Sequence, residues 1–222
     1  MSWLTPSRRR GVEVLDDPAT PPHVRERAMR DVGRSNRLFG GTRAVLRALP
    51  AAGGDRLTAL DVGTGTGDIP GRMRGVTTIG LDISEPLLRI ARARVDAVVA
   101  GSVLALPFRD GSADIVTCSQ LLHHFEGRDI TGLVRELDRV SRRLVIISDI
   151  RRSWFAAGGF WVASTALRFH PVTRHDGVVS VLRGFTAREL QSIVRAAVGR
   201  EPRIRRSAFW RLTVVWEKNG RR

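Results

Sequence analysis

The sequence predicts an α/β protein with a doubly wound, mostly parallel sheet. Short apolar runs alternate with helical stretches, a glycine-rich turn follows the first of these runs, and the second run ends in an acidic residue. Alternation of strands and helices typically gives a parallel sheet with helices on both faces. A chain of 222 residues has room for one such domain and a small appended segment.

Apolar runs too short for a typical helix are taken as strands. They lie at 57–62, 77–83, 97–100, 113–118 and 143–148. Helical spacing of apolar residues is found at 68–74, 84–95, 127–141 and 186–198. The last apolar run, 208–216, has no helix after it, and we expect it to end the sheet as an antiparallel strand.

The first 54 residues differ from the rest. Prolines and a run of arginines at 8–10 indicate that residues 1–22 are an arm that docks on the body or stays mobile. Helices are expected from about residue 23 and over 42–49, with a break at 51–54. We predict that residues 1–54 form part of a cap on a catalytic domain at 55–222.

The charge of +15 is compatible with an acidic partner such as nucleic acid or anionic lipid. Lys218 is the only lysine, however, and the arginines are spread along the chain, as GC-rich coding also produces. Nucleic-acid binding is therefore the lesser interpretation. The single cysteine, Cys118, excludes an internal disulfide, and no secretory or membrane-length apolar run is present, so we expect a cytoplasmic protein.

The segment LDVGTGTGD at 60–68 places glycines at alternate positions directly after a strand. Such a turn binds a dinucleotide, a nucleoside triphosphate or S-adenosylmethionine. The Gly-Lys-Ser/Thr of a triphosphate loop is missing. Asp68 replaces the third dinucleotide glycine and, at the start of the helix expected at 68–74, would repel a pyrophosphate. Asp61 and Asp68 together suit the cationic S-adenosylmethionine. The alternative is that the loop is only a structural turn whose acids cap a helix.

Four stretches together resemble the class I S-adenosylmethionine-dependent methyltransferases. They are LDVGTGTG, IGLDIS, LALPFRDGSADIVTCSQLLHHF and a run ending RLVIISD, all within residues 57–150. The resemblance implies a seven-stranded Rossmann-like methyltransferase sheet with a final antiparallel hairpin. The segments LDDPATPPHVRERAMRDVGRSNRLFGG and HPVTRHDGVVSVLRGFTARELQSIV look like those of bacterial methyltransferases found beside type III polyketide synthases, which implies a small aromatic or polyketide-derived acceptor.

The resemblance also assigns cofactor contacts. Asp82, 19 residues after Gly63, is expected to hold the ribose hydroxyls, and the glycine loop to approach the methionine portion. Many relatives carry an aspartate where this chain has Ser102, whose hydroxyl accepts a hydrogen bond more weakly. The expected cofactor-binding residues are Asp61, Gly63, Gly65, Gly67, Asp82, Ile83, Ser102, Val103 and Ser119.

His123 and His124 follow the strand at 113–118, at the sheet edge that faces ligands. We take His123 as the candidate general base; the alternative is that these histidines only pack beside the cofactor. His175 and Asp176 are either a second pair at the pocket or, as Asp-Gly favours, a plain turn. No cysteine, histidine and aspartate grouping has metal-ligand spacing, so no metal site is expected.

An aromatic helix is expected after the strand at 143–148, and residues 151–185 are predicted to be the acceptor-site insertion. Its aromatic residues are Trp154, Phe155, Phe160, Trp161 and Phe169. Three interpretations of these residues stay open: stacking on a planar acceptor, packing as a lid against the N-terminal helices, or contact with a membrane surface. Arginines at 151, 152 and 168 flank the run and suit the last alternative.

The expected function is methyl transfer from S-adenosylmethionine to oxygen or carbon of a small, aromatic or polyketide-derived acceptor. Two alternatives are an RNA methyltransferase that uses the basic surface and a non-catalytic cofactor-binding partner. No Asn-Pro-Pro-Tyr element follows the fourth strand and the chain has no tyrosine, which speaks against amino-group methylation of nucleic acid or protein. The acceptor, the methylated atom, the use of a base and the oligomeric state stay open.

Overall fold

A computed structural model describes residues 4–9, 11–17, 19–50 and 57–218. Its sheet has the strand order β3-β2-β1-β4-β5-β7-β6. The strands are β1 (Leu57–Val62), β2 (Val76–Asp82), β3 (Ala97–Ala100), β4 (Ala113–Ser119), β5 (Ser141–Ile150), β6 (Arg203–Ser207) and β7 (Arg211–Glu217). Strands β1 to β5 are parallel, and β7 is antiparallel to both neighbours. The predicted doubly wound, seven-stranded sheet is confirmed.

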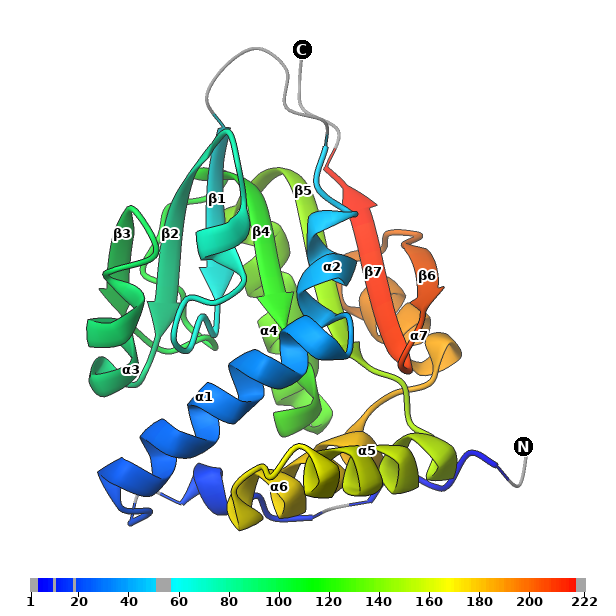
Figure 1. Ribbon diagram of the computed structural model, residues 1–222. Helices are drawn as coiled ribbons and strands as arrows, with labels where there is room; N and C mark the ends of the chain where they lie inside the picture. The colour runs from blue at the N-terminus through cyan, green and yellow to red at the C-terminus, as the bar shows by residue number, and fades with distance from the viewer. Residues whose placement is uncertain (1–3, 10, 18, 51–56, 219–222) are drawn as a thin grey trace.

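The helices occupy three places around the sheet (Figure 1). They are α1 (Pro22–Leu38), α2 (Gly41–Leu46), α3 (Glu85–Ala91), α4 (Gly127–Val140), α5 (Trp154–Ala166), α6 (Pro171–Arg183) and α7 (Ala187–Val198), with 3-10 turns η1 (Val14–Asp16), η2 (Pro70–Arg72) and η3 (Leu122–His124). Helix α2 packs on one face of the sheet, and α4 and α7 pack on the other. Helices α1, α5 and α6 lie beyond the carboxyl ends of β1 and β4 (Figure 1). None of the helices in the described ranges is both long and apolar enough to cross a bilayer.

Two apolar clusters hold these layers together. The larger joins Val116 and Val145 of the sheet to Leu133 of α4 and Leu190 of α7, all fully buried. The smaller joins the opposite face of the same strands to α2. Successive strand side chains point to opposite faces, so one strand contributes to both clusters. Burying each such side chain stabilises the fold by roughly 1.5–3 kcal/mol, which makes the sheet a rigid platform.

The helix expected at 68–74 was wrong, because only the 3-10 turn η2 forms there. Pro70 and Gly71 are poor helix formers, and a side chain at Gly71 would come within 2.9 Å of a backbone oxygen. Asp68 therefore does not sit at an α-helix N-terminus. Its carboxylate lies 3.5 Å from Arg37 and 3.2 Å from Arg94, so these ion pairs, rather than a helix dipole, set its electrostatics.

The strand expected at 208–216 begins later than predicted, and residues 208–210 form a hairpin turn. Phe209 and Trp210 have positive φ angles of 55° and 54° within this three-residue connection, which joins the paired residues Ser207 and Arg211. The pattern of apolar residues missed β6, because this edge strand reads RIRRS and is largely exposed. The turn brings both aromatic residues to the same edge of the sheet as the ends of β1 and β4.

The described part of the N-terminal arm docks on the body. Arg152 donates from Nε to the carbonyl oxygen of Pro6 at 2.7 Å. Asp176 accepts from the backbone of Val14 and Leu15 at 2.9 and 3.0 Å. Asp176 lies inside α6, so the turn expected there was wrong. The break at 51–54 and the boundary between residues 54 and 55 lie outside the described residues.

Candidate active site

A cavity of about 640 Å³ lies at the carboxyl edge of the sheet. Its walls come from Asp82, Gln120 and His123 at strand ends, from Glu13 of the arm, and from α1, α5 and α6. This volume is in the range of small-molecule sites. Ligands of doubly wound sheets bind in this place, at the carboxyl ends of the strands.

A smaller pocket of about 110 Å³ adjoins the glycine loop. Asp61, Gly63, Gly65 and Ser119 line it on the sheet side. Helix α1 closes it with Met29, Val32, Gly33 and Asn36, none of which the sequence pattern had indicated. Met29, Val32 and Gln120 line both spaces, so the two adjoin along α1 and the end of β4.

The three loop glycines all have positive φ but do different things. Gly63 has a φ of 73°, and a side chain there would come within 2.8 Å of Leu121. A side chain at Gly65 would come within 3.1 Å of Met29. Gly67 lines neither pocket; a side chain there would press on α3 at 3.2 Å. Gly63 leaves room for Leu121, Gly65 keeps the loop clear of α1, and Gly67 permits close packing of α3.

Asp82 ties the loop to β2. Its carboxylate accepts from the backbone of Gly65 at 2.8 Å and of Ser84 at 2.9 Å, and the residue also lines the larger cavity. Three other expected contacts lie nearby in the chain but line neither pocket. Ile83 is 77% exposed, Ser102 accepts from the backbone of Leu104 at 3.3 Å, and Val103 packs on the main core.

Asp61 and Ser119 give the smaller pocket its chemistry. Asp61 is buried and accepts from the Thr117 hydroxyl at 2.5 Å. Burial raises the pKa of Asp61 to about 6, although the Thr117 hydrogen bond acts in the opposite direction. The Ser119 hydroxyl is buried with no hydrogen-bond partner among the described residues. A buried carboxyl without a cation and an unpaired hydroxyl fit a ligand that brings a positive charge and hydrogen-bonding groups.

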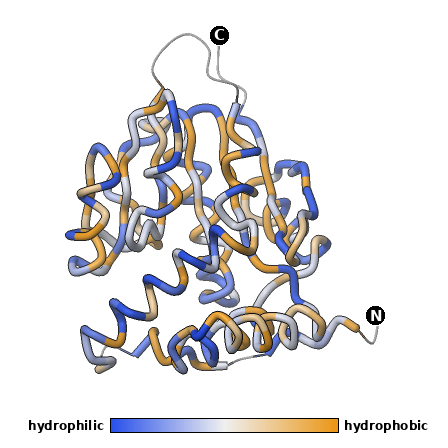
Figure 2. Tube along the Cα trace, viewed as in Figure 1, coloured by the Kyte–Doolittle hydropathy of each residue, from blue (hydrophilic) through white to orange (hydrophobic). Residues whose placement is uncertain are grey.

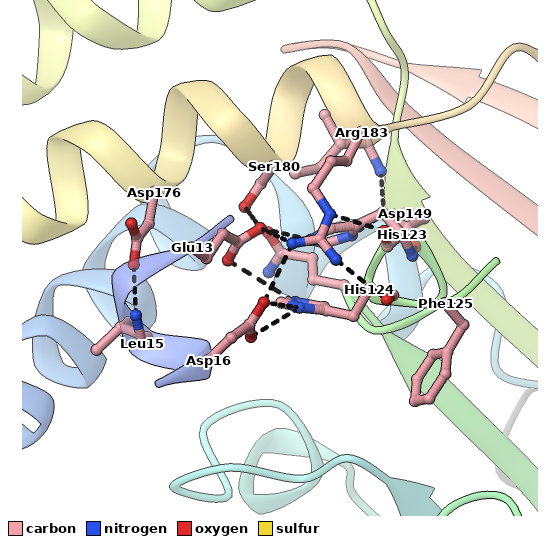
Figure 3. Close-up of polar contacts among 12 residues, drawn as sticks. Glu13, Leu15, Asp16, His123, His124, Phe125, Asp149, Asp176, Ser180 and Arg183 are labelled. Atoms are coloured by element: carbon pink, nitrogen blue, oxygen red, sulfur yellow. Dashed lines mark hydrogen bonds and ion pairs between the residues drawn. The ribbon is translucent and has the colours of Figure 1, made fainter. Parts of the chain in front are cut away.

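His123 lies in η3, buried against the end of β5 (Figure 3). Its Nδ1 is 2.7 Å from Asp149 Oδ1, and its backbone N–H donates to the same carboxylate at 3.2 Å. Burial opposes ionisation of Asp149, but the charge and hydrogen bond of His123 outweigh it and lower the pKa of this carboxyl. The Asp149 carboxylate can accept only from a protonated Nδ1, and in the neutral ring of that tautomer the lone pair is on Nε2, which is 3.7 Å from Glu13.

Glu13 is a buried acid that sequence patterns did not indicate. The Ser180 hydroxyl donates to it at 2.8 Å, and Arg183 Nη1 lies 3.5 Å away (Figure 3). His124 is 3.1 Å from Asp16 through Nδ1. Burial alone would lower the pKa of His124, but its Asp16 hydrogen bond and the charges of Glu13 and Asp16 raise it. The arm thus joins α6 and η3 through charged side chains.

Glu13, His123 and His124 place ligand atoms within 4.8 Å of one another, a grouping that could hold a metal ion. The sequence spacing did not indicate it, because Glu13 reaches the histidines only through the docked arm. Arg183 already lies beside Glu13 and pairs with Asp16 at 3.1 Å. This guanidinium offsets part of the negative charge of the two carboxylates.

Gln120 connects the two pockets and was not among the expected site residues. It has a φ of 52°, which is uncommon outside glycine and costs about 1–3 kcal/mol. Its side-chain amide bonds Asn36 of α1 and accepts from Arg211 Nη1 at 2.7 Å. Burial lowers the pKa of Arg211 to about 10, although the charge of Asp149 acts in the opposite direction. The left-handed backbone of Gln120 places its side-chain amide where the two pockets adjoin.

Comparison with known proteins identifies the central part of the chain. The family profile described as "Methyltransferase domain" matches residues 60–147. Residues 60–147 are a methyltransferase domain. A demethylmenaquinone methyltransferase of Roseiflexus sp. (strain RS-1) is 36% identical over 115 residues, which are 48% of this chain and 46% of that protein. A probable tRNA methyltransferase 9B of Bos taurus is 35% identical over 38% of this chain and 18% of its own length.

The chain thus spans half the length, or less, of the curated relatives it matches. Among solved structures, a SAM-dependent methyltransferase of Thermotoga maritima, described as a possible histamine N-methyltransferase, aligns with a TM-score of 0.64. The alignment covers 89% of this chain and 99% of that one at 17% identity. The fold around the methyltransferase domain is therefore that of S-adenosylmethionine-dependent enzymes.

The methyltransferase domain supplies only part of the cavity wall. It contains the glycine loop, Asp82, Gln120 and His123, whereas Glu13, Asp149 and helices α1, α5 and α6 lie outside the matched residues. The aromatic residues of 151–185 are divided among three environments. Phe160 lines the cavity, Phe169 is buried beneath Arg34, and Trp154, Phe155 and Trp161 are exposed.

Proposed function

We propose that the chain transfers a methyl group from S-adenosylmethionine to oxygen, or to an acidic ring carbon, of a small aromatic or polyketide-derived acceptor. The observation that carries this proposal is the buried Asp149–His123 pair, whose histidine lines a large cavity next to the glycine loop of a methyltransferase domain. The demethylmenaquinone methyltransferases among the relatives support a quinone-like or phenolic acceptor.

The smaller pocket fits the cationic half of the cofactor. When bound, S-adenosylmethionine supplies an electrophilic methyl group. Asp61 would attract its ammonium, and Ser119 would use its unpaired hydroxyl there. Asp82 retains free lone pairs on both carboxylate oxygens for the ribose hydroxyls. We retain Ile83, Ser102 and Val103 as proposed contacts on the adenine side, and Gly63 and Gly65 as the close backbone approach.

The larger cavity offers an aromatic ring both apolar surface and a cluster of titratable groups. Phe125, Phe160, Phe209 and Trp210 offer apolar and aromatic surface for a planar ring. Glu13 and both histidines form a titratable cluster at η3, and Asp82 and Arg211 line the cavity as well. An acceptor hydroxyl directed at this cluster would place the ring among the aromatic side chains.

His123 is the proposed general base. Its Nε2 would take the proton from the acceptor as the methyl group is transferred, and Asp149 would stabilise the resulting imidazolium. Arg8 and Arg183 donate to the carbonyl oxygen of His123 at 3.2 and 3.1 Å, which fixes the position of η3. A well-placed base of this kind accelerates a step by about 10²–10⁴-fold.

The proposal is tested by turnover with methyl-labelled cofactor against resorcinols, pyrones and quinols, with bulk RNA alongside. We expect label in a small phenolic product, and the same rate after dialysis against a chelator, because Arg183 already offsets part of the charge of Glu13. Calorimetry that detects no binding of S-adenosylmethionine or S-adenosylhomocysteine would refute the cofactor assignment. Label in RNA alone would favour the RNA methyltransferase, and binding without any turnover would favour a non-catalytic partner.

A further inference from the structure

The outer face of α5 is an uncovered apolar surface. Trp154, Phe155, Trp161 and Val162 are 42%, 60%, 57% and 60% exposed. The other exposed positions of the helix are Gly158, Gly159, Thr165 and Ala166. One exposed aromatic side chain is ordinary, but four large apolar residues on one face of a 13-residue helix form a contiguous patch. Figure 2 shows α5 at the margin of the molecule with little hydrophilic colouring.

An arginine lies at each end of this patch. The chain has no charged residue between Arg152 and Arg168, so α5 itself is uncharged. The Arg9 guanidinium lies 4.8 Å from the centre of the Trp154 ring, and Arg168 is exposed beyond the other end of the helix. Asp176 is the only acid within 151–185, and it is buried and bonded to the arm backbone. The rim of the patch therefore complements a negatively charged surface.

The opposite side of α5 faces the acceptor cavity. Ala156, Phe160 and Ala163 line that space. Phe155 also borders a separate depression with Arg151 and Arg206. A single helix therefore separates the cavity from the patch, with one side directed inward and the other toward solvent.

We propose that the outer face of α5 docks on a bilayer that contains anionic lipid, with the helix lying in the interface. Tryptophan and phenylalanine side chains favour this depth, and arginines at the helix ends can bind lipid phosphates. A second copy of the chain is a poorer occupant, because it would bring together two arginine-rimmed surfaces on chains of charge +15. Docking would bring the cavity close to a lipophilic acceptor. This consequence rests on the proposed function, whereas the docking itself is independent of it.

The test is co-sedimentation of the full chain with vesicles of phosphatidylcholine alone or with added phosphatidylglycerol. We expect binding to the anionic vesicles only, weaker at high salt, with a blue shift of tryptophan fluorescence. The double substitution Phe155→Ser and Val162→Ser should lower the vesicle partition coefficient at least about tenfold. Leu38→Ser is the matched control, because Leu38 is also an exposed apolar residue, at 50%, but lies on α1.

Equal binding to neutral and anionic vesicles, or full binding by the double variant, would overturn the proposal. A dimer in gel filtration that the same substitutions dissociate, with no vesicle binding, would assign the patch to a second copy instead. Circular dichroism checks folding, and Trp161→Ser serves as a milder variant. Turnover of a water-soluble acceptor should be unchanged by these substitutions, so failure of the docking is distinguishable from failure of the proposed function.

Discussion

The two walls of the active site are held by different kinds of interaction. The sheet wall consists of backbone turns and buried strands, and its glycine loop is fixed by local hydrogen bonds such as Gly65 to Asp82. The cap wall is assembled from segments far apart in the chain, joined by charged side chains such as Glu13 and Arg183. Local backbone contacts therefore fix the sheet wall, whereas the cap wall depends on a few side chains that the fold brings together.

The largest expected effect lies where the two walls meet. Asp149→Asn should lower kcat by about 10²–10⁴-fold, because an amide no longer stabilises the imidazolium of His123. Affinity for the cofactor, measured by calorimetry, should stay unchanged. The double variant with His123→Ala should be no slower than His123→Ala alone, since the two residues act as a unit. Additive losses would show that Asp149 acts independently of His123.

A substitution in the sheet wall separates backbone strain from crowding. Gly63→Ala and Gly111→Ala both place a side chain at positive φ, which costs about 1–2 kcal/mol of stability. The new side chain at Gly63 meets Leu121, whereas the one at Gly111 meets nothing within 4 Å. Thermal unfolding should show a larger loss at Gly63, where crowding adds to backbone strain, and only Gly63→Ala should weaken cofactor binding, by at least about tenfold. Equal weakening by both would remove Gly63 from the cofactor site.

Cofactor affinity should depend on pH through the other sheet-wall group. Asp61, with its pKa raised to about 6, is protonated below that pH and then offers no charge to a cation. Calorimetry should therefore show affinity rising by up to about tenfold per pH unit toward pH 6 and levelling off above it. Asp61→Asn should bind weakly at every pH. A flat profile for the unmodified protein would mean that Asp61 does not face the cationic part.

The smallest expected effect concerns the cap wall. The raised pKa of His124 means that its pairing with Asp16 stabilises the docked arm fully below about pH 6.5 and weakens as pH rises through the folded pKa. Because Asp16 is 41% exposed, solvent screening limits the contribution to about 0–1 kcal/mol. Asp16→Asn should lower Tm more at pH 6 than at pH 9. Asp17→Asn, a neighbouring exposed acid, should show no such difference.

The sheet wall could be predicted largely from sequence, because its features are local. Alternating apolar runs indicated β1 to β5, and the spacing of Gly63 and Asp82 indicated one ligand edge. Helical periodicity failed at 68–74, where apolar residues recur but Pro70 and Gly71 prevent an α-helix. Charged β6 gave no apolar signal at all.

The cap wall was mostly beyond the reach of sequence patterns. His123 was found from its place after a strand, but its partners Asp149 and Glu13 belong to other segments, and nothing in their local sequence marks them. Gln120 was missed for a different reason. Its role depends on a left-handed backbone at the end of β4, and glutamine gives no sign of that conformation.

The docking of the arm has a consequence for biosynthesis. Residues 13–16 are made before any strand of the sheet, yet Asp176, Ser180 and Arg183, which receive them, are made after β5. Domains gain structure progressively during synthesis, so the strands up to β5 can form before the arm has docked on α6. A nascent chain that ends before these positions would lack a complete cavity wall, so any chemistry in the cavity has to wait until α6 has been made.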